Sequence, residues 1–480
     1  MPSPASSTTT TRSTTASLPS ATSQRHSAQE YEEVAVPQSA RRSLVSVSAV
    51  WLGFPMILTC AVFGGLIVYS LGFWPGILAI ALGNLVLMAY VGSLSFVAGR
   101  SGKNFALTAI ETFGRRGYLV PCGFLATVVI GWFAFQTGLT GSILHGSLGW
   151  NERSTTLAAG IGFLAATLLG IRALSVIGMI AAPMYLILGG VAIWFAAEHS
   201  TVASVTSYPG GAGHAAMSLG AAVTLVIASF IDSGTMTADF TRWSRSGRQG
   251  FLASMSAFPI GNTIAMVVGG IIVALGAATD PATNGGTFLN ILIAHGGILI
   301  PLAAAFVLIN LGSVCTHCLY NGAVGWAQLT GTTMRRLTLI LGAAGIVLAV
   351  AGIWSYFDQW LNLLGVIVPP IGIVLILDQL VLPHFAPAFS AATPRIRTAS
   401  TSALPGERTG NTPTQVRWAS FAGWAAGSVA ALLAHALTPW MSDAVIGMLT
   451  AAAVFIAVQA VESHARHRTL GELSHDPANG

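Results

Sequence analysis

The chain alternates long apolar runs with short polar connections along most of its length. A helix needs about 20 apolar residues to cross the hydrocarbon core of a bilayer, and twelve runs have lengths of that order. We therefore predict twelve transmembrane helices, at 44–71, 73–98, 117–145, 155–171, 174–197, 216–240, 250–277, 297–328, 335–354, 357–382, 417–437 and 441–462.

The polar segments divide the chain. Residues 1–43 are rich in Ser, Thr and Ala and hold no apolar run, which predicts a disordered tail and no cleaved signal peptide. Residues 44–382 form a ten-helix core, and 383–416, rich in Pro, Ser and Thr, form a linker. Helices 11 and 12 occupy 417–462, and 463–480 form a second tail.

Composition supports a lipid environment. Hydrophobic residues make up 53% of the chain and charged residues only 8%, whereas soluble domains carry about 25% charged residues. The mean hydropathy is +0.72. An all-α polytopic membrane protein, with the lipid bilayer as its partner, is the class that fits.

The basic residues set the orientation. If the N-terminus is cytoplasmic, every Lys and Arg except Arg153 falls in the tail, linker or loop segments on the inner side, as the positive-inside rule requires. We therefore expect a multi-pass protein of the cell membrane with both termini in the cytoplasm. The same distribution explains the basic pI, so no nucleic-acid partner is implied.

Motifs for enzymes, ATP and metals are missing from the sequence. The only lysine is Lys103, and no phosphate-binding loop surrounds it. Cys315 and Cys318 form a C-x-x-C without a second pair or histidines at zinc spacing, so packing is the favoured interpretation. We predict no enzyme activity, no cofactor and no metal beyond Na⁺, and transport that is passive or driven by an ion gradient.

Glycine and proline mark two spans near their middles, five spans apart. Gly53-Phe54-Pro55 interrupts span 1, and the stretch Ser229 to Thr235 interrupts span 6. Unwound backbone at the middle of the membrane is where transporters bind solutes and ions. The matching positions predict two inverted halves, spans 1–5 and 6–10, followed by two extra helices. Gly64-Gly65 is attributed to helix packing.

Asp232 lies within the otherwise apolar span 6. An intramembrane carboxylate is costly unless it is paired, neutralised or in contact with water. Three roles stay open: a carrier of a proton that travels with the solute, an acceptor for an N–H-rich or cationic substrate, or a cap of the broken helix. His317 in span 8 could share the proton.

Trp132 and Gln136 in span 3 are four residues apart and so share one helical face. An indole can stack on a flat ring while an amide reads the ring's hydrogen-bonding edge. We interpret this pair as part of a site for a planar heterocycle.

Several stretches resemble the nucleobase:cation symporter-1 family, and its cytosine permeases in particular. They include Val36 to Arg41, Gly131-Trp132-Phe133, and Ser229 to Arg242, which is similar to S-F-I-S-A-G-T-L-T-A-D-F-V-R. Asn310 with Leu319-Tyr320, and Pro369 to Gly372 with Asp378, continue the likeness over 36–462. The resemblance implies a LeuT-type fold of a 5+5 inverted repeat plus two C-terminal helices, working by alternating access.

The resemblance also implies residue roles. Trp132 and Phe230 would sandwich the substrate, and its edge would contact the residues around them: Gln136, Ser229, Asp232, Ser233, Gly234 and His317. A sodium site would use the backbone carbonyls of Gly53 and Met56 with the side chains of Asn310 and Ser313. Sodium prefers oxygen ligands, and the hydroxyl that follows the Ser313 position in cytosine permeases is replaced by Val314.

Two further departures concern the substrate. Asp232 stands where the family motif has Ser, and Val129 stands where cytosine permeases have Gln, whereas Gln136 matches hydantoin- and allantoin-type members. We expect a monomeric importer of a nucleobase or related heterocycle (cytosine, purine, hydantoin, allantoin or a pyrimidine vitamin precursor), coupled to H⁺ or Na⁺. The alternative is a membrane receptor that binds such a ligand without moving it.

Overall fold

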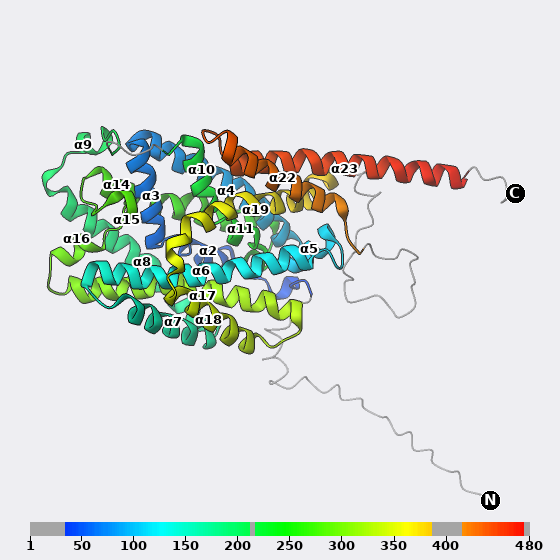
Figure 1. Ribbon diagram of the computed structural model, residues 1–480. Coiled ribbons are helices and arrows are strands. Elements are labelled where there is room, and N and C mark those ends of the chain that lie inside the picture. Colours follow the sequence, from blue (N-terminus) through cyan, green and yellow to red (C-terminus); the bar gives the residue numbers. More distant parts are fainter. Residues whose placement is uncertain (1–33, 212–216, 386–414, 475–480) are drawn as a thin grey trace, which may run out of the picture.

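The computed structural model describes residues 34–211, 217–385 and 415–474, and these residues fold as helices joined by short connections (Figure 1). The α-helices are α2 (Leu44–Leu52), α3 (Leu58–Leu71), α4 (Phe73–Ser101), α5 (Phe105–Phe113), α6 (Leu119–Leu148), α7 (Glu152–Leu168), α8 (Ile171–Ala196), α9 (Val202–Thr206), α10 (Leu219–Ala228), α11 (Ile231–Thr235), α12 (Ala238–Thr241), α13 (Gly247–Met255), α14 (Asn262–Ala274), α15 (Pro281–Asn284), α16 (Leu289–Ala294), α17 (Leu299–Thr330), α18 (Met334–Val350), α19 (Phe357–Ile376), α20 (Leu382–Phe385), α22 (Trp418–Leu437) and α23 (Asp443–Ser474).

Within the described residues, eight helical segments are long and apolar enough to cross a membrane. They are Phe73–Ser101, Leu119–Leu148, Val176–Ala196, Gly247–Ala274, Leu299–Thr330, Ile353–Val381, Trp418–Leu437 and Asp443–His464. The shorter apolar helices α3 and α10 belong to predicted spans 1 and 6. Span 1 is divided into α2 and α3, and span 6 into α10, α11 and α12. Spans 4 and 9 correspond to α7 and α18, of 17 residues each. The count of twelve stays a prediction.

Span 1 is broken between Leu52, the last residue of α2, and Leu58, the first of α3. The break includes Gly53-Phe54-Pro55, where Pro55 has no N–H to donate to a helix. Tight turns fill the gap: the N–H of Met56 donates to the carbonyl of Gly53 at 3.3 Å. The backbone therefore changes direction in the middle of the bundle.

Span 6 is broken at Ser229 and Phe230, between α10 and α11. Phe230 leaves helical geometry, with φ −142° and ψ 11°. The two breaks meet, because the rings of Phe54 and Phe230 lie 5.6 Å apart, centroid to centroid.

Close helix packing explains several glycines. A Cβ on Gly64 would lie 1.8 Å from the carbonyl oxygen of Met266 in α14, and one on Gly269 would lie 1.9 Å from that of Ala61 in α3. Such distances exclude any side chain, so α3 and α14 touch backbone to backbone. This agrees with the packing role assigned to Gly64.

The disordered tail that we predicted at 1–43 extends too far along the chain. Residues 1–33 of it lie outside the described part. Residues 34–43 are held against the helices: the N–H of Val36 donates to the carbonyl of Gly102 at 2.8 Å. The guanidinium of Arg41 donates to the carbonyl of Gly99 at 2.6 Å. These bonds fix the chain just before span 1.

At the other end, α23 continues past residue 462 to Ser474, so part of the predicted second tail is helical. It extends beyond the rest of the bundle (Figure 1, red). The linker predicted at 383–416 lies almost wholly outside the described residues.

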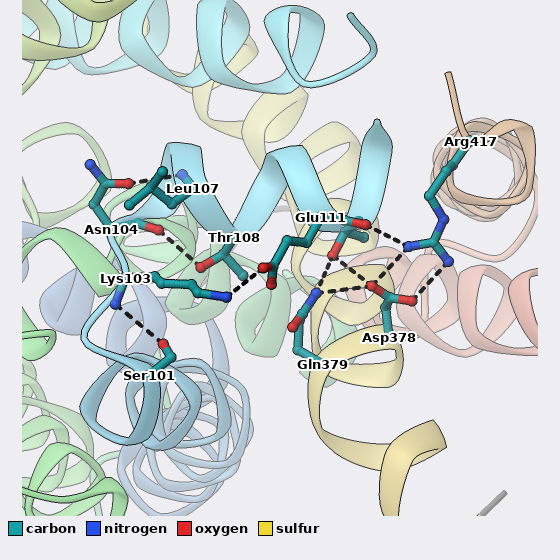
Figure 2. Close-up of polar contacts among 10 residues, drawn as sticks. Ser101, Lys103, Asn104, Leu107, Thr108, Glu111, Asp378, Gln379 and Arg417 are labelled. Carbon is teal, nitrogen blue, oxygen red and sulfur yellow. Dashed lines mark hydrogen bonds and ion pairs between the residues drawn. The ribbon is translucent and has the colours of Figure 1, made fainter. Parts of the chain in front are cut away.

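A buried polar network joins α5, the end of α19 and the start of α22 (Figure 2). The guanidinium of Arg417 pairs with both carboxylate oxygens of Asp378, Nη2 to Oδ1 at 2.9 Å and Nη1 to Oδ2 at 3.0 Å. Oδ2 also accepts from the Thr112 hydroxyl at 2.9 Å and from Gln379 Nε2 at 3.0 Å. Arg417 Nη1 donates in addition to the Glu111 carbonyl at 2.7 Å. The positive charge of Arg417 and the negative charge of Asp378 are therefore paired with each other.

Candidate functional site

The side chain of Asn310, in α17, forms hydrogen bonds to the backbone at the break in span 1. Its Oδ1 accepts from the N–H of Leu58 at 2.8 Å, and its Nδ2 donates to the carbonyl of Met56 at 2.9 Å. The amide thus satisfies a backbone group on each side of the turn into α3, which the break would otherwise leave unpaired. Two of the predicted cation ligands, Met56 and Asn310, are therefore in direct contact with each other.

The other two predicted cation ligands approach the same helix, α8. A Cβ on Gly53 would lie 3.3 Å from the carbonyl oxygen of Gly178, and one on Gly178 would lie 3.6 Å from the Ser313 hydroxyl. Gly178 is also next to His317, whose Nδ1 lies 2.7 Å from the carbonyl oxygen of Ser313. The His317 ring contacts Phe54 edge to face at 6.1 Å.

Gln136 of α6 is fully buried and its amide is fixed in orientation. The hydroxyl of Thr59, the second residue of α3 after the span 1 break, donates to Gln136 Oε1 at 2.8 Å. Gln136 Nε2 has no hydrogen-bond partner in the described part of the chain. The amide therefore presents a donor.

Asp232 is 0% exposed, and neither carboxylate oxygen makes a hydrogen bond to a described residue. The Trp132 indole N–H and the backbone and hydroxyl groups of Ser233 are donors beside this carboxylate. The backbone N–H groups of Asp232 and Ser233 also lie beside the carboxylate, so the capping role stays a prediction. Trp132 Nε1 is likewise buried and without a hydrogen bond.

The two predicted aromatic residues lie in separate clusters. Trp132 packs against Phe357 and Trp360 of α19, with centroids 5.6 and 4.9 Å away. Phe230 packs against Phe54 and Phe258, at 5.6 and 5.4 Å. Trp132 and Phe230 make no ring contact with each other. The structure places Asp232 close to Trp132, and Asp232 is two residues after Phe230 in the chain.

Two other predicted site residues have local roles here. The Ser229 hydroxyl donates to the carbonyl of Val226 in its own helix at 2.7 Å. A Cβ on Gly234 would lie 2.6 Å from Val91 Cγ2, so this glycine allows α11 to approach α4. Among Ser229, Ser233 and Gly234, only Ser233 lies beside the Asp232 carboxylate.

Sequence reasoning missed the support around this site. The Tyr90 hydroxyl is 2.6 Å from Thr235 Oγ1, and a Cβ on Gly372 would lie 1.8 Å from that same hydroxyl. Gly372, in the motif after Pro369-Pro370, thus leaves room for Tyr90. Thr59 could have been suspected, since it is a polar residue directly after a break.

No group of three or more His, Cys, Asp or Glu that could hold a metal ion occurs among the residues described. Cys315 lies 3.6 Å from the Thr137 hydroxyl. That contact fits a packed position inside the bundle.

Comparison with known proteins adds independent findings. A family model described as permease for cytosine/purines, uracil, thiamine and allantoin matches residues 35–400. The cytosine permease of Escherichia coli (strain K12) is 30% identical over 362 residues, covering 73% of this chain and 82% of the relative. The hydantoin permease of Microbacterium maritypicum is 25% identical over 354 residues, covering 69% and 72%.

Two solved structures each match 90% of the length of this chain. Mhp1, a nucleobase-cation-symport-1 family transporter in a closed conformation with bromovinylhydantoin bound, has a TM-score of 0.71, 19% identity and 96% of its own length covered. A Na⁺-coupled sialic acid symporter has a TM-score of 0.62, 12% identity and 92% covered. At these identities the likeness shows a common fold.

Proposed function

The chain belongs to the family of permeases for cytosine/purines, uracil, thiamine and allantoin, and on that premise we propose that it imports a nucleobase or related planar heterocycle. The mechanism is cation-coupled alternating access. The observation that carries the proposal is the meeting of two broken helices beside buried polar groups that make no hydrogen bond to a described residue. Transporters bind solutes where helices unwind inside the membrane.

The proposed architecture has twelve membrane-spanning helices, the first ten as two inverted halves. Both termini lie in the cytoplasm of a cell-membrane protein, and the chain works as a monomer. The positions of the two helix breaks, in predicted spans 1 and 6, support the inverted halves. The distribution of arginines supports the orientation.

In the proposed site, the substrate ring lies near Trp132 and Phe230, and its edge faces Asp232 and Gln136. Trp132 already contacts α19 and Phe230 contacts the span 1 break. A ring that enters between the two clusters would contact α6 on one side and the broken helices on the other, which links binding to movement of α6 against the broken helices. That is the behaviour alternating access requires.

Two cations fit different residues. Na⁺ would use the carbonyls of Gly53 and Met56 with Asn310 and Ser313, whereas H⁺ would use an acidic or imidazole group such as Asp232 or His317. The hydrogen bonds of Asn310 to Met56 and Leu58 would have to rearrange before Asn310 could bind Na⁺. This arrangement and Val314 weigh against sodium.

Uptake by cells that make the protein tests the function. Labelled cytosine, adenine, guanine, uracil, allantoin and hydroxymethylpyrimidine are supplied, with cells carrying an empty vector as the control. We expect accumulation of at least one compound above its external concentration. A protonophore abolishes it if H⁺ is coupled, and choline in place of sodium abolishes it if Na⁺ is coupled. Accumulation that survives both treatments contradicts cation coupling.

A further inference from the structure

Several buried polar side-chain atoms make no hydrogen bond within the described structure, and four of them belong to the candidate site: both oxygens of Asp232, Nε1 of Trp132 and Nε2 of Gln136. The exposed fractions of these residues are 0%, 4% and 0%. Buried polar groups in native proteins are almost always paired, and each exception needs an explanation. Their positions beside the breaks in spans 1 and 6 indicate a polar ligand.

These atoms have a defined donor and acceptor pattern. An ionised carboxylate offers two parallel acceptors and no donor, and an indole N–H only donates. Gln136 could present either end of its amide, but the Thr59 bond to Oε1 turns Nε2 outward as a donor. The site therefore combines a pair of acceptors at Asp232 with single donors at Trp132 and Gln136.

We propose, resting on the proposed function, that the substrate presents two adjacent parallel N–H donors to Asp232 and a ring acceptor to Gln136 or Trp132. The 2-amino-4-oxopyrimidine edge has this pattern: a ring N–H beside an exocyclic amino group, with a carbonyl next to them. Guanine and isocytosine carry it. Thr59 is a positioning residue for Gln136 in this recognition.

The competing assignment is a protonated Asp232. A carboxylic acid offers one donor and one acceptor, and it would fit an edge with N–H beside C=O, as in hypoxanthine, xanthine or uracil. The Trp132 N–H and the Ser233 groups beside Asp232 are donors, which an ionised carboxylate can accept. The proposal therefore takes the ionised form, and the matched ligands below decide between the two forms. Two further N–H donors from the substrate would complete its surroundings.

Matched ligands separate these assignments. Guanine and hypoxanthine differ only by the exocyclic amino group, and xanthine replaces that group with a carbonyl. In competition uptake by proteoliposomes holding the full chain, guanine should inhibit at a concentration about tenfold or more below hypoxanthine, because a charge-assisted hydrogen bond is lost. Isocytosine against uracil repeats the comparison on a single ring.

The decisive variant is Asp232→Asn. An amide offers one acceptor and one donor side by side, which suits the N–H and C=O of xanthine and leaves one guanine N–H facing a donor. The preference should therefore reverse, with the guanine-to-xanthine affinity ratio falling by about a hundredfold, since two hydrogen bonds change partner. Asp358→Asn, the same change at an exposed position of α19, should leave the ratio unchanged.

Thr59 gives a second test that does not alter the charge. Thr59→Val keeps the shape and removes the hydroxyl, so Gln136 can turn and the affinity for guanine should fall several-fold. Thr59→Ser keeps the hydroxyl and should restore it. Loss in both variants would mean that Thr59 only packs, and would contradict its positioning role.

The outcomes remain distinguishable. A reversed preference in Asp232→Asn establishes the proposed edge recognition. Equal affinity for guanine and hypoxanthine, with a uniform loss for all compounds in Asp232→Asn, overturns it and leaves transport of another heterocycle intact. No accumulation of any compound overturns the proposed function itself. Monodisperse elution of the variants from a size-exclusion column shows whether they have folded.

Discussion

A carboxylate buried in an apolar bundle raises the free energy of the folded protein unless it is paired or hydrogen-bonded. Within the described structure, Asp232 accepts no hydrogen bond. Two other buried polar side chains, Asn310 and Asp378, do have hydrogen-bond partners. Asn310 is equally buried but uses both ends of its amide, and Asp378 pairs with Arg417. Asp232 therefore differs from these two side chains in having no hydrogen bond to a described residue.

The aromatic residues give the first prediction. Trp132→Ala and Phe230→Ala should each weaken substrate binding about five- to hundredfold, because stacking of a base on an aromatic ring contributes about 1–3 kcal/mol. Binding is measured by displacement of the labelled compound from purified protein. Trp132→Phe separates the ring from the N–H and should lose less than Trp132→Ala. Normal affinity in both alanine variants would place the site elsewhere.

At the scale of elements, the breaks in spans 1 and 6 could be predicted because glycine, proline and a buried acid interrupt otherwise apolar sequence. The shared face of Trp132 and Gln136 followed from helical spacing. What closes the breaks could not be predicted. Thr59 to Gln136 and Leu58 to Asn310 are contacts between segments far apart in the chain, and no local pattern encodes their pairing.

The sequence predicted that the N-terminal tail extends to residue 43, which is too far, and the reason is the same. The segment before span 1 is polar and has no periodicity of its own. Its order comes from backbone carbonyls of α4 and of the residues after α12, at Gly99 and Ser244, which accept from Arg41. Composition alone cannot report such acceptors.

Asn310 carries a prediction about the span 1 break. Asn310→Ala leaves the N–H of Leu58 and the carbonyl of Met56 buried without partners, at a cost of about 1–3 kcal/mol each. The variant should therefore melt at a lower temperature in detergent, and added sodium should not restore it. Ser313→Ala, which removes one predicted sodium ligand without touching the break, is the matched control. An unchanged melting temperature for Asn310→Ala would show that water satisfies both groups.

The network of Figure 2 carries the second prediction at this scale. Arg417→Met leaves the buried Asp378 carboxylate without its cation, and breaking one partner of such a pair costs about 3–5 kcal/mol. The double variant Arg417→Met with Asp378→Leu removes both charges and should recover part of the loss. Thermal unfolding of the wild type, both single variants and the double variant measures the coupling. Additive effects would show that the ion pair does not join α22 to α19.

For the whole molecule, the family and the all-helical fold follow from both sequence and structure. The cation that is coupled to transport follows from neither. The broken helices lie against long unbroken ones, α6 and α17, which carry Trp132, Gln136, Asn310 and Ser313. The proposed substrate residues Trp132 and Gln136 thus lie on α6, and the proposed cation ligands Asn310 and Ser313 lie on α17. Both helices contact the chain next to the span 1 break, through Gln136 and Asn310. This arrangement allows one movement of that break to expose or cover both.

The central claim is that the protein moves a planar heterocycle across the membrane and does more than bind it. Solute counterflow in proteoliposomes tests this most directly: vesicles loaded with unlabelled guanine or isocytosine are diluted into a trace of the labelled compound. Exchange through an alternating-access carrier should give a transient accumulation of label far above that in empty vesicles, and Asp232→Asn should abolish it for guanine. Saturable binding of the label without accumulation inside any loaded vesicle, across the whole panel of heterocycles, would contradict the claim and identify a receptor.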